Sequence, residues 1–312
     1  MAKLSFVSYH YLSRDDEFKR IWGIDFNLFK EHIAYYLDNY KLIDPKELLN
    51  NNFTDDGNYL LLTFDDGLRE HYQISEYLLK FKIKVLFSIS TCILRNEPPN
   101  PQIIHFGMAY YGIRKFYQLV VAEIEKDFPQ HLEFFPVDAK KIELMALHKI
   151  IKDVFRIKLN YFETRRILLQ VYQKYLLKDF PDFMVRIFLG RKQIDQIIKS
   201  GHSLGVHTDT HCVVSDIIGN QEIVKQEIEK PKQILSQLVG EEVNIFTYPF
   251  GLSEDILDDQ NVLKGFGYDL VFTAFNPGLD LNRLNLGRYP VNSQDRVDDL
   301  KNNLWQYSGK LS

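Results

Sequence analysis

The chain has 312 residues, a formal net charge of −4 and 45% hydrophobic residues. That hydrophobic fraction supplies a folded core and excludes an intrinsically disordered chain. The near-neutral charge gives no support to general nucleic-acid binding, so we expect no nucleic-acid partner. The length allows one large domain or two ordinary ones.

The first hundred residues predict strands alternating with helices. The strands show alternating or continuous apolar residues, and the helices show apolar residues three and four positions apart. This order is typical of a parallel α/β core. The expected elements are strands at 4–9, 59–64 and 85–90, and helices at 26–37, 45–49 and 71–81.

A breaker cluster at 96–101 ends this pattern, since it contains three prolines. From there to about residue 178 the sequence is mostly helical, and we expect three helices at roughly 103–126, 139–157 and 161–178. We therefore predict a single domain over 1–312 that carries a helical insertion at about 98–185. His105 lies in this insertion, where it could line the site, although a satisfied core or surface histidine is expected.

The later half of the insertion is basic, with ten lysines and arginines between 140 and 178. One interpretation is a solvated helix face. The other is a patch for a phosphate-bearing carrier, or for an anionic membrane surface that the protein would contact peripherally.

The α/β pattern resumes after the insertion. Strands are expected at 202–206, 244–248, 270–274 and 286–291, with helices at 191–200, 220–238 and 253–264.

Thr63-Phe64-Asp65-Asp66-Gly67 follows the apolar run 59–62. Two adjacent carboxylates at the end of a buried strand are costly to desolvate, so they need a metal or a proton-transfer task. A similar sequence, Thr54-Asp55-Asp56-Gly57, follows a polar stretch and predicts only a solvated turn. Gly67 permits an unusual backbone turn, so one carboxylate can bind metal while the other receives a proton.

His207-Thr208-Asp209-Thr210-His211 forms a second cluster. His207 and His211 can reach one metal ion, and with one aspartate they leave coordination positions open for water. His202 would lie on the opposite face of its strand, so we expect a structural role for it. In a parallel β/α barrel, active-site residues gather at the carboxyl ends of strands, and both clusters fall at such ends.

The segments 63–67, 207–211 and Tyr248-Pro249-Phe250-Gly251 resemble the first three motifs of the polysaccharide deacetylases, the NodB-homology group of carbohydrate esterase family 4. The resemblance covers about 1–92 and 186–295. It implies a distorted (β/α)7 TIM-like barrel. It also implies a deacetylase of the kind associated with surface-polysaccharide biosynthesis.

The resemblance also implies the roles of individual residues. Asp66, His207 and His211 would bind a divalent metal, commonly zinc, with cobalt, nickel or manganese as alternatives. Asp65 would be the catalytic base. The third motif, Tyr248, Pro249, Phe250 and Gly251, would contact substrate, and a backbone N–H near Tyr248 would help to hold the oxyanion.

The sequence departs from the common pattern of this family in two places. The late His-Asp pair is missing, since no histidine follows His211, and Phe246-Thr247 stands where an arginine usually leads the third motif. Tyr9-His10 resembles the N-terminal Tyr-His of permuted members, so we predict that His10 is the general acid. Arg288 is the candidate for the missing arginine, which would keep Asp65 ionised.

These observations predict a metal-dependent hydrolase that removes an N-acetyl group from an amino sugar of a cell-surface polysaccharide or its lipid- or nucleotide-linked precursor. One alternative is a deformylase or other amidohydrolase on a related C–N bond. Another is a catalytically degenerate saccharide-binding protein.

The predicted location is the cytoplasm, with the inner face of the membrane as an alternative. Two cysteines, Cys92 and Cys212, are too few for a disulfide framework, so we expect both to be reduced. No secretory signal opens the chain, and no segment approaches the roughly 20 apolar residues of a membrane span.

Overall fold

The computed structural model describes residues 2–50, 53, 56–136, 139–257, 261–274 and 284–310. Thr54 and Asp55 of the predicted solvated turn, and 258–260 of the predicted helix at 253–264, lie outside the described residues.

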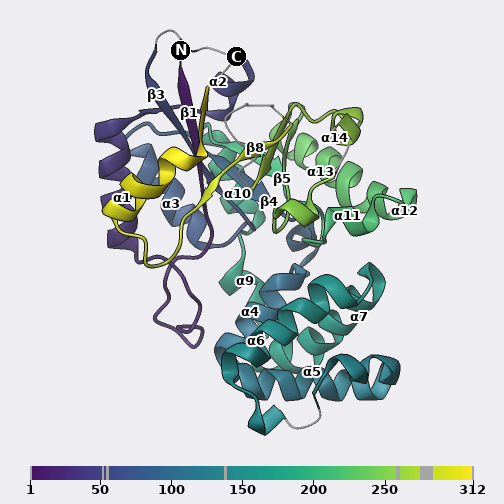
Figure 1. The fold of residues 1–312 in the computed structure, drawn as a ribbon. Helices are drawn as coiled ribbons and strands as arrows, with labels where there is room; N and C mark the ends of the chain where they lie inside the picture. The colour runs from purple at the N-terminus through teal and green to yellow at the C-terminus, as the bar shows by residue number, and fades with distance from the viewer. Residues whose placement is uncertain are drawn as a thin grey trace.

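A curved, mainly parallel sheet forms the centre of the fold (Figure 1). Its hydrogen-bonded order is β10-β1-β3-β4-β5-β6-β7-β8, with β2 beside β3, β9 beside β1, and β10 antiparallel to β1. The strands are β1 (Lys3–Tyr9), β2 (Lys41–Leu42), β3 (Asn58–Phe64), β4 (Leu86–Ile89), β5 (Ser203–Val206), β6 (Ile245–Thr247), β7 (Leu270–Thr273), β8 (Leu286–Gly287), β9 (Tyr289–Pro290) and β10 (Ser308–Lys310).

The segment Leu286–Pro290 closes the sheet into a barrel. Its first half, β8, pairs with β7, and its second half, β9, pairs in parallel with β1. Among the described residues the ring therefore runs β1, β3, β4, β5, β6, β7 and β8/β9, back to β1. The predicted distorted TIM-like barrel is confirmed. The single strand predicted at 286–291 is divided at Arg288, because its two halves face different neighbours.

Alternate residues along the strands fill the barrel or face the surrounding helices. The interior cluster takes Phe6 from β1, Leu61 from β3, Leu86 from β4 and Phe272 from β7. Their neighbours along the strands pack outward against the helices. Both faces of the parallel sheet are thus buried, which explains the nearly continuous apolar runs in the sequence.

The helices and short 3-10 or π segments account for most of the remaining chain. Around the barrel lie α1 (Phe26–Asn39), α2 (Pro45–Asn50), α3 (Glu70–Leu79), α10 (Arg191–Lys199), α11 (Val214–Ile217), α12 (Gln221–Val224), α13 (Lys230–Val239), α14 (Asn261–Gly265) and α15 (Val297–Asn303). A π-helical segment, Lys225–Glu229, joins α12 to α13, so the predicted helix at 220–238 is one interrupted helix.

The insertion forms a separate group of helices below the sheet in Figure 1. Its members are α4 (Asn100–Tyr111), α5 (Ile113–Asp127), α6 (Leu144–Asp153), α7 (Tyr161–Val171), α8 (Leu177–Asp179) and α9 (Phe183–Ile187), with π-helical segments after α6 and α7. The helix predicted at 103–126 is wrong in one respect. Gly112, at φ +78°, breaks it into α4 and α5, because glycine tolerates this backbone conformation.

The loop between β1 and α1 joins the barrel to the insertion. Phe18 is fully buried there, and its ring contacts those of Phe106 in α4 and Phe183 in α9. Arg186 of α9 bonds Asp16 and Glu17 of the same loop. That barrel and insertion form a single domain stays a prediction.

Both cysteines are free and buried, as expected. Within the described ranges, no helix combines the length and the apolar composition needed to cross a bilayer.

Candidate active site

The three predicted metal ligands meet at the carboxyl ends of β3 and β5, the two strands that flank β4 in the barrel. Asp66 follows β3, and His207 and His211 follow β5. Asp66 Oδ1 lies 3.5 Å from His207 Nε2 and 3.3 Å from His211 Nε2. One potential ligand atom from each residue lies within 4.8 Å of the others, and all three residues are buried.

The donor set fits a divalent ion. Asp66 Oδ1 and His207 Nε2 are buried and have no hydrogen-bond partner, which is costly unless something else satisfies them. His207 Nδ1 lies 2.8 Å from the Thr247 carbonyl oxygen, so it carries the proton and leaves Nε2 free as a ligand. Two imidazoles and a carboxylate are ligands typical of zinc.

Four residues of the three motifs have positive φ, a backbone conformation that residues other than glycine rarely adopt. Asp66, Thr208, His211 and Phe250 all have φ between +56° and +80°. Each such residue costs of order 1–3 kcal/mol, and such costs cluster at functional sites. Among the other non-glycine residues that the structure describes, only Lys82 and Asn96 have positive φ.

Asp65 lies beside the metal-ligand cluster and is bound by Arg288. Arg288 Nη1 donates to Asp65 Oδ1 at 2.9 Å, and Nη2 donates to Oδ2 at 2.7 Å. Nη1 also donates to Thr63 Oγ1. Both charged residues are about 2% exposed. The structure therefore places Arg288 against the predicted base, although the role of each residue stays a prediction.

This pair determines the charge of Asp65. Burial alone would raise the pKa of Asp65, but the charge and hydrogen bonds of Arg288, together with the nearby His207 and His10, lower it to about 2. Asp65 is therefore ionised at neutral pH and able to accept a proton.

His10, the predicted acid, lies at the open side of the cluster. Its Nε2 is 3.8 Å from Asp65 Oδ2, and its side chain is 40% exposed. Its carbonyl oxygen accepts a hydrogen bond from His71 Nε2 at 3.0 Å, which fixes the backbone from which the ring projects.

Among the four predicted substrate contacts of the third motif, Tyr248 packs into the core and Phe250 lies beside His211. The Tyr248 side chain is buried against Phe246, and its hydroxyl accepts from the Leu257 N–H. The Tyr248 N–H donates to the Phe272 carbonyl, and Pro249 has no N–H. The Phe250 ring lies edge-on to that of His211, with centroids 4.8 Å apart. The first backbone N–H after Tyr248 is therefore that of Phe250.

Gly251 has a packing role. A Cβ at this position would lie 2.6 Å from the Ala274 backbone nitrogen. Only glycine allows this close approach at φ +65°.

A buried carboxylate that the sequence analysis missed holds the histidine loop in place. Glu227 Oε2 accepts from the backbone N–H groups of Asp209 and Thr210, both at 2.9 Å. Its Oε1 accepts from Thr210 Oγ1 and from the hydroxyl of Tyr161, a residue of the insertion. Glu227 stands four residues after Ile223 on an apolar helix face, and an acid at such a position signals a buried partner.

Asp209 is fixed from its other side. Its carboxylate accepts two hydrogen bonds from Arg95, at 2.7 and 2.6 Å, and one from Thr91 Oγ1. The loop between the two histidines is thus held by charged partners from two parts of the chain, Arg95 and Glu227.

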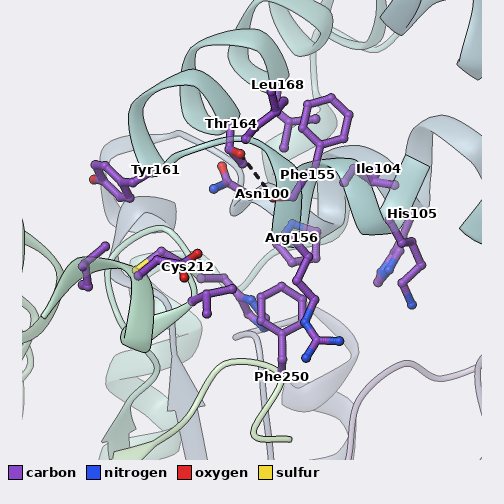
Figure 2. Close-up of a pocket in the computed structure, with 17 residues that line it drawn as sticks. Asn100, Ile104, His105, Phe155, Arg156, Tyr161, Thr164, Leu168, Cys212 and Phe250 are labelled. Atoms are coloured by element: carbon purple, nitrogen blue, oxygen red, sulfur yellow. Dashed lines mark hydrogen bonds between the residues drawn. The ribbon is translucent and has the colours of Figure 1, made fainter. Parts of the chain in front are cut away.

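A pocket of about 60 Å³ opens beside His211, between the insertion and the barrel loops (Figure 2). Phe155, Ile104 and Leu168 of the insertion line it above, and Phe250 lies below with the Arg156 guanidinium 5.3 Å from its ring centre. His105 also lines this pocket. Its Nδ1 lies 3.0 Å from the Tyr11 hydroxyl.

The family model of polysaccharide deacetylases matches residues 157–271. The match contains the second and third motifs. It begins inside the helical insertion, earlier than the residue 186 expected from the resemblance. No curated protein matches the chain by sequence.

Solved structures of similar fold cover nearly the whole chain. The deacetylase PplD of Streptococcus pyogenes, solved in complex with acetate, has a TM-score of 0.59 at 15% identity over 97% of this chain and 98% of its own. A de-N-acetylase of Aggregatibacter actinomycetemcomitans has a TM-score of 0.58 at 14% identity, over 96% and 99%. IcaB of Ammonifex degensii has a TM-score of 0.54 at 16% identity, over 97% and 96%.

The family match confirms the predicted resemblance and the enzyme class, a hydrolase of the polysaccharide deacetylase type. The structural matches agree with the barrel described above.

Replacing Glu227 tests its hold on the histidine loop. In Glu227→Gln, an amide N–H₂ replaces one carboxylate oxygen, so the loop loses one of the two acceptor atoms and the negative charge that hold it. We expect zinc affinity to fall by about 10- to 100-fold, because outer hydrogen-bond partners orient metal ligands. Competition with a zinc chelator measures this. Glu222→Gln, at an exposed position of the same helix, is the control and should keep full affinity. Equal affinities would contradict the assignment.

Arg288→Met tests the buried ion pair. The variant leaves the Asp65 charge buried without a partner, so the free energy of unfolding should fall by about 3–5 kcal/mol at pH 7. The double variant Asp65→Asn/Arg288→Met removes that charge and should recover much of the loss. Denaturant titration measures both variants.

The wild-type pair also predicts a pH dependence of stability. The pKa of Asp65 is about 2 in the folded protein, below its value in the unfolded chain. This carboxylate therefore stabilises the fold above about pH 4, and the contribution is lost as pH falls towards 2. If the free energy of unfolding falls between pH 4 and pH 2 by the same amount in wild type and in Arg288→Met, the pairing is contradicted.

Proposed function

We propose that the protein is a metal-dependent hydrolase that removes the N-acetyl group from an amino sugar of a cell-surface polysaccharide or its precursor. The convergence of Asp66, His207 and His211, with the ionised Asp65 beside them, carries this proposal. The family match at 157–271 supports the polysaccharide class of substrate. The predicted cytoplasmic location stays a prediction.

Asp66, His207 and His211 would hold the ion. When bound, a divalent ion supplies Lewis-acid chemistry, since it polarises the acyl oxygen and makes water a stronger acid. Zinc is the expected metal for two imidazoles and one carboxylate.

Asp65 takes the part of the general base. It accepts the proton of the attacking water, and Arg288 keeps it anionic until then. The bidentate contact also fixes the orientation of the carboxylate, because the guanidinium is planar and bonds both oxygens.

The developing negative charge on the acyl oxygen needs a fixed donor. The Phe250 N–H takes this part, because the Tyr248 N–H is bonded to Phe272 and Pro249 has none. The positive φ of Phe250 supports this assignment, since strained backbone is retained where it aims a functional group.

His10 takes the part of the general acid. The amine of the sugar is a poor leaving group unless it is protonated, and no histidine follows His211 in the sequence. The exposed His10 ring lies within reach of a group bound at Asp65, so its proton can pass to the departing nitrogen.

Acetate release from N-acetylated amino sugars tests the function. Purified protein should release acetate from N-acetylhexosamine substrates with added zinc or cobalt, and lose this activity after treatment with a chelator. Release of formate from formylated analogues, with acetyl sugars left intact, would instead establish a deformylase. Saccharide binding without any hydrolysis would establish a degenerate binding protein.

His10→Ala separates leaving-group protonation from the attack of water. The rate on a sugar amide should fall by about 100- to 10,000-fold, the usual range for loss of a general acid. An activated aryl acetate needs no protonation on leaving, so its hydrolysis by the variant should fall much less. Zinc titration of the variant checks that the metal ligands are intact. Equal losses on both substrates would mean that His10 is not the acid.

A further inference from the structure

A second pocket adjoins the one beside His211. It has a volume of about 660 Å³ and shares His105 and Lys152 with the first pocket. It lies between the loop after β1 and helices α4 and α6. A ligand can therefore contact the metal-ligand region at one end and this second pocket at the other.

The charges around the second pocket are of one sign. Lys19, Arg20 and Lys152 line it together with two histidines, and none of its lining residues is acidic. In the described part of the chain, none of these three cationic side chains has an ion-pair or hydrogen-bond partner. Other basic groups of the insertion are paired: Arg156 with Asp255, Arg165 with Glu97, and Lys174 with Glu123.

Burial and neighbouring cations disfavour the charged forms of Lys152 and His148 in this pocket. Desolvation and then the neighbouring Arg156 charge lower the pKa of Lys152. Desolvation and then Lys152 lower the pKa of His148. An anion bound between these groups would reverse both effects, because an opposite charge favours the charged form of each.

We propose that this second pocket binds the phosphate or diphosphate group of an N-acylated sugar phosphate whose amide lies at Asp66, His207 and His211. The inference rests on the proposed function and names the class of its substrate. Lys19 and Lys152 act as point charges for the phosphate oxygens, and the planar guanidinium of Arg20 can bind two of them at once.

The rim of the pocket has apolar surface for whatever the phosphate is attached to. Trp22 is 73% exposed and Leu144 is 48% exposed, and both line the pocket. The Trp22 and His148 rings lie 6.2 Å apart. Such a rim suits a polyprenyl chain or the base of a nucleotide, both of which present apolar or aromatic surface beyond the phosphate.

Paired substrates test the subsite. The metal-loaded protein should have a kcat/KM for N-acetylglucosamine 1-phosphate at least about tenfold above that for N-acetylglucosamine, since hydrogen bonds to charged groups are worth such a factor. The UDP-linked and the polyprenyl-diphosphate-linked sugars then distinguish the two sources of the phosphate.

Variants locate the effect. The double variant Arg20→Gln/Lys152→Gln should lose the preference for the phosphorylated sugar by at least about tenfold. Lys115→Gln removes one charge from an exposed position of α5 outside the pocket and should keep the wild-type preference. A preference that survives in the double variant would overturn the subsite.

A binding measurement is independent of catalysis. Calorimetry with inorganic pyrophosphate uses chelator-treated protein, so that no metal can hold the anion. Wild type should bind, and the double variant should bind at least about tenfold more weakly. Acetate release from both sugars without preference would overturn the subsite alone. No release from any of these sugars would overturn the proposed function, and the pyrophosphate result would still decide the subsite.

Discussion

Two adjacent carboxylates are buried at the end of one strand, and the rest of the site follows from the need to keep both charged. Isolated buried carboxylates would take up protons, because desolvation disfavours the anion. Asp65 is held by Arg288, from the segment that closes the barrel, and Asp66 faces the imidazoles of His207 and His211. Each carboxylate has its own partner, which supports the different chemical roles proposed for the two.

The insertion contributes to this site as well as covering it. The Tyr161 hydroxyl bonds Glu227, which holds the loop between the two histidines. Arg156 bonds Asp255 and lies over the Phe250 ring. A change in the helices of the insertion would therefore reach the metal ligands through bonded neighbours, and would alter more than access for the substrate.

The sequence was sufficient to predict the strand ends that carry Asp65, Asp66 and His207, because apolar runs followed by polar residues have a strong local pattern. It was insufficient for Glu227, whose partners Asp209, Thr210 and Tyr161 depend on packing between distant segments. The break at Gly112 was missed because an isolated glycine inside a helical pattern is often tolerated. Arg288 was predicted only because the third motif lacks its usual arginine. The residues around Arg288 form no motif that would have identified it.

The segment 286–290, which closes the barrel, has a consequence for how this protein folds during its own synthesis. Arg288 lies between β8 and β9, so the same five residues complete the ring of strands and neutralise Asp65. A nascent polypeptide that has not yet emerged from the ribosome as far as this segment has an open sheet and an uncompensated carboxylate. Asp65, the proposed base, therefore gains its neutralising partner only when the barrel closes, which links the charge state of this carboxylate to completion of the fold.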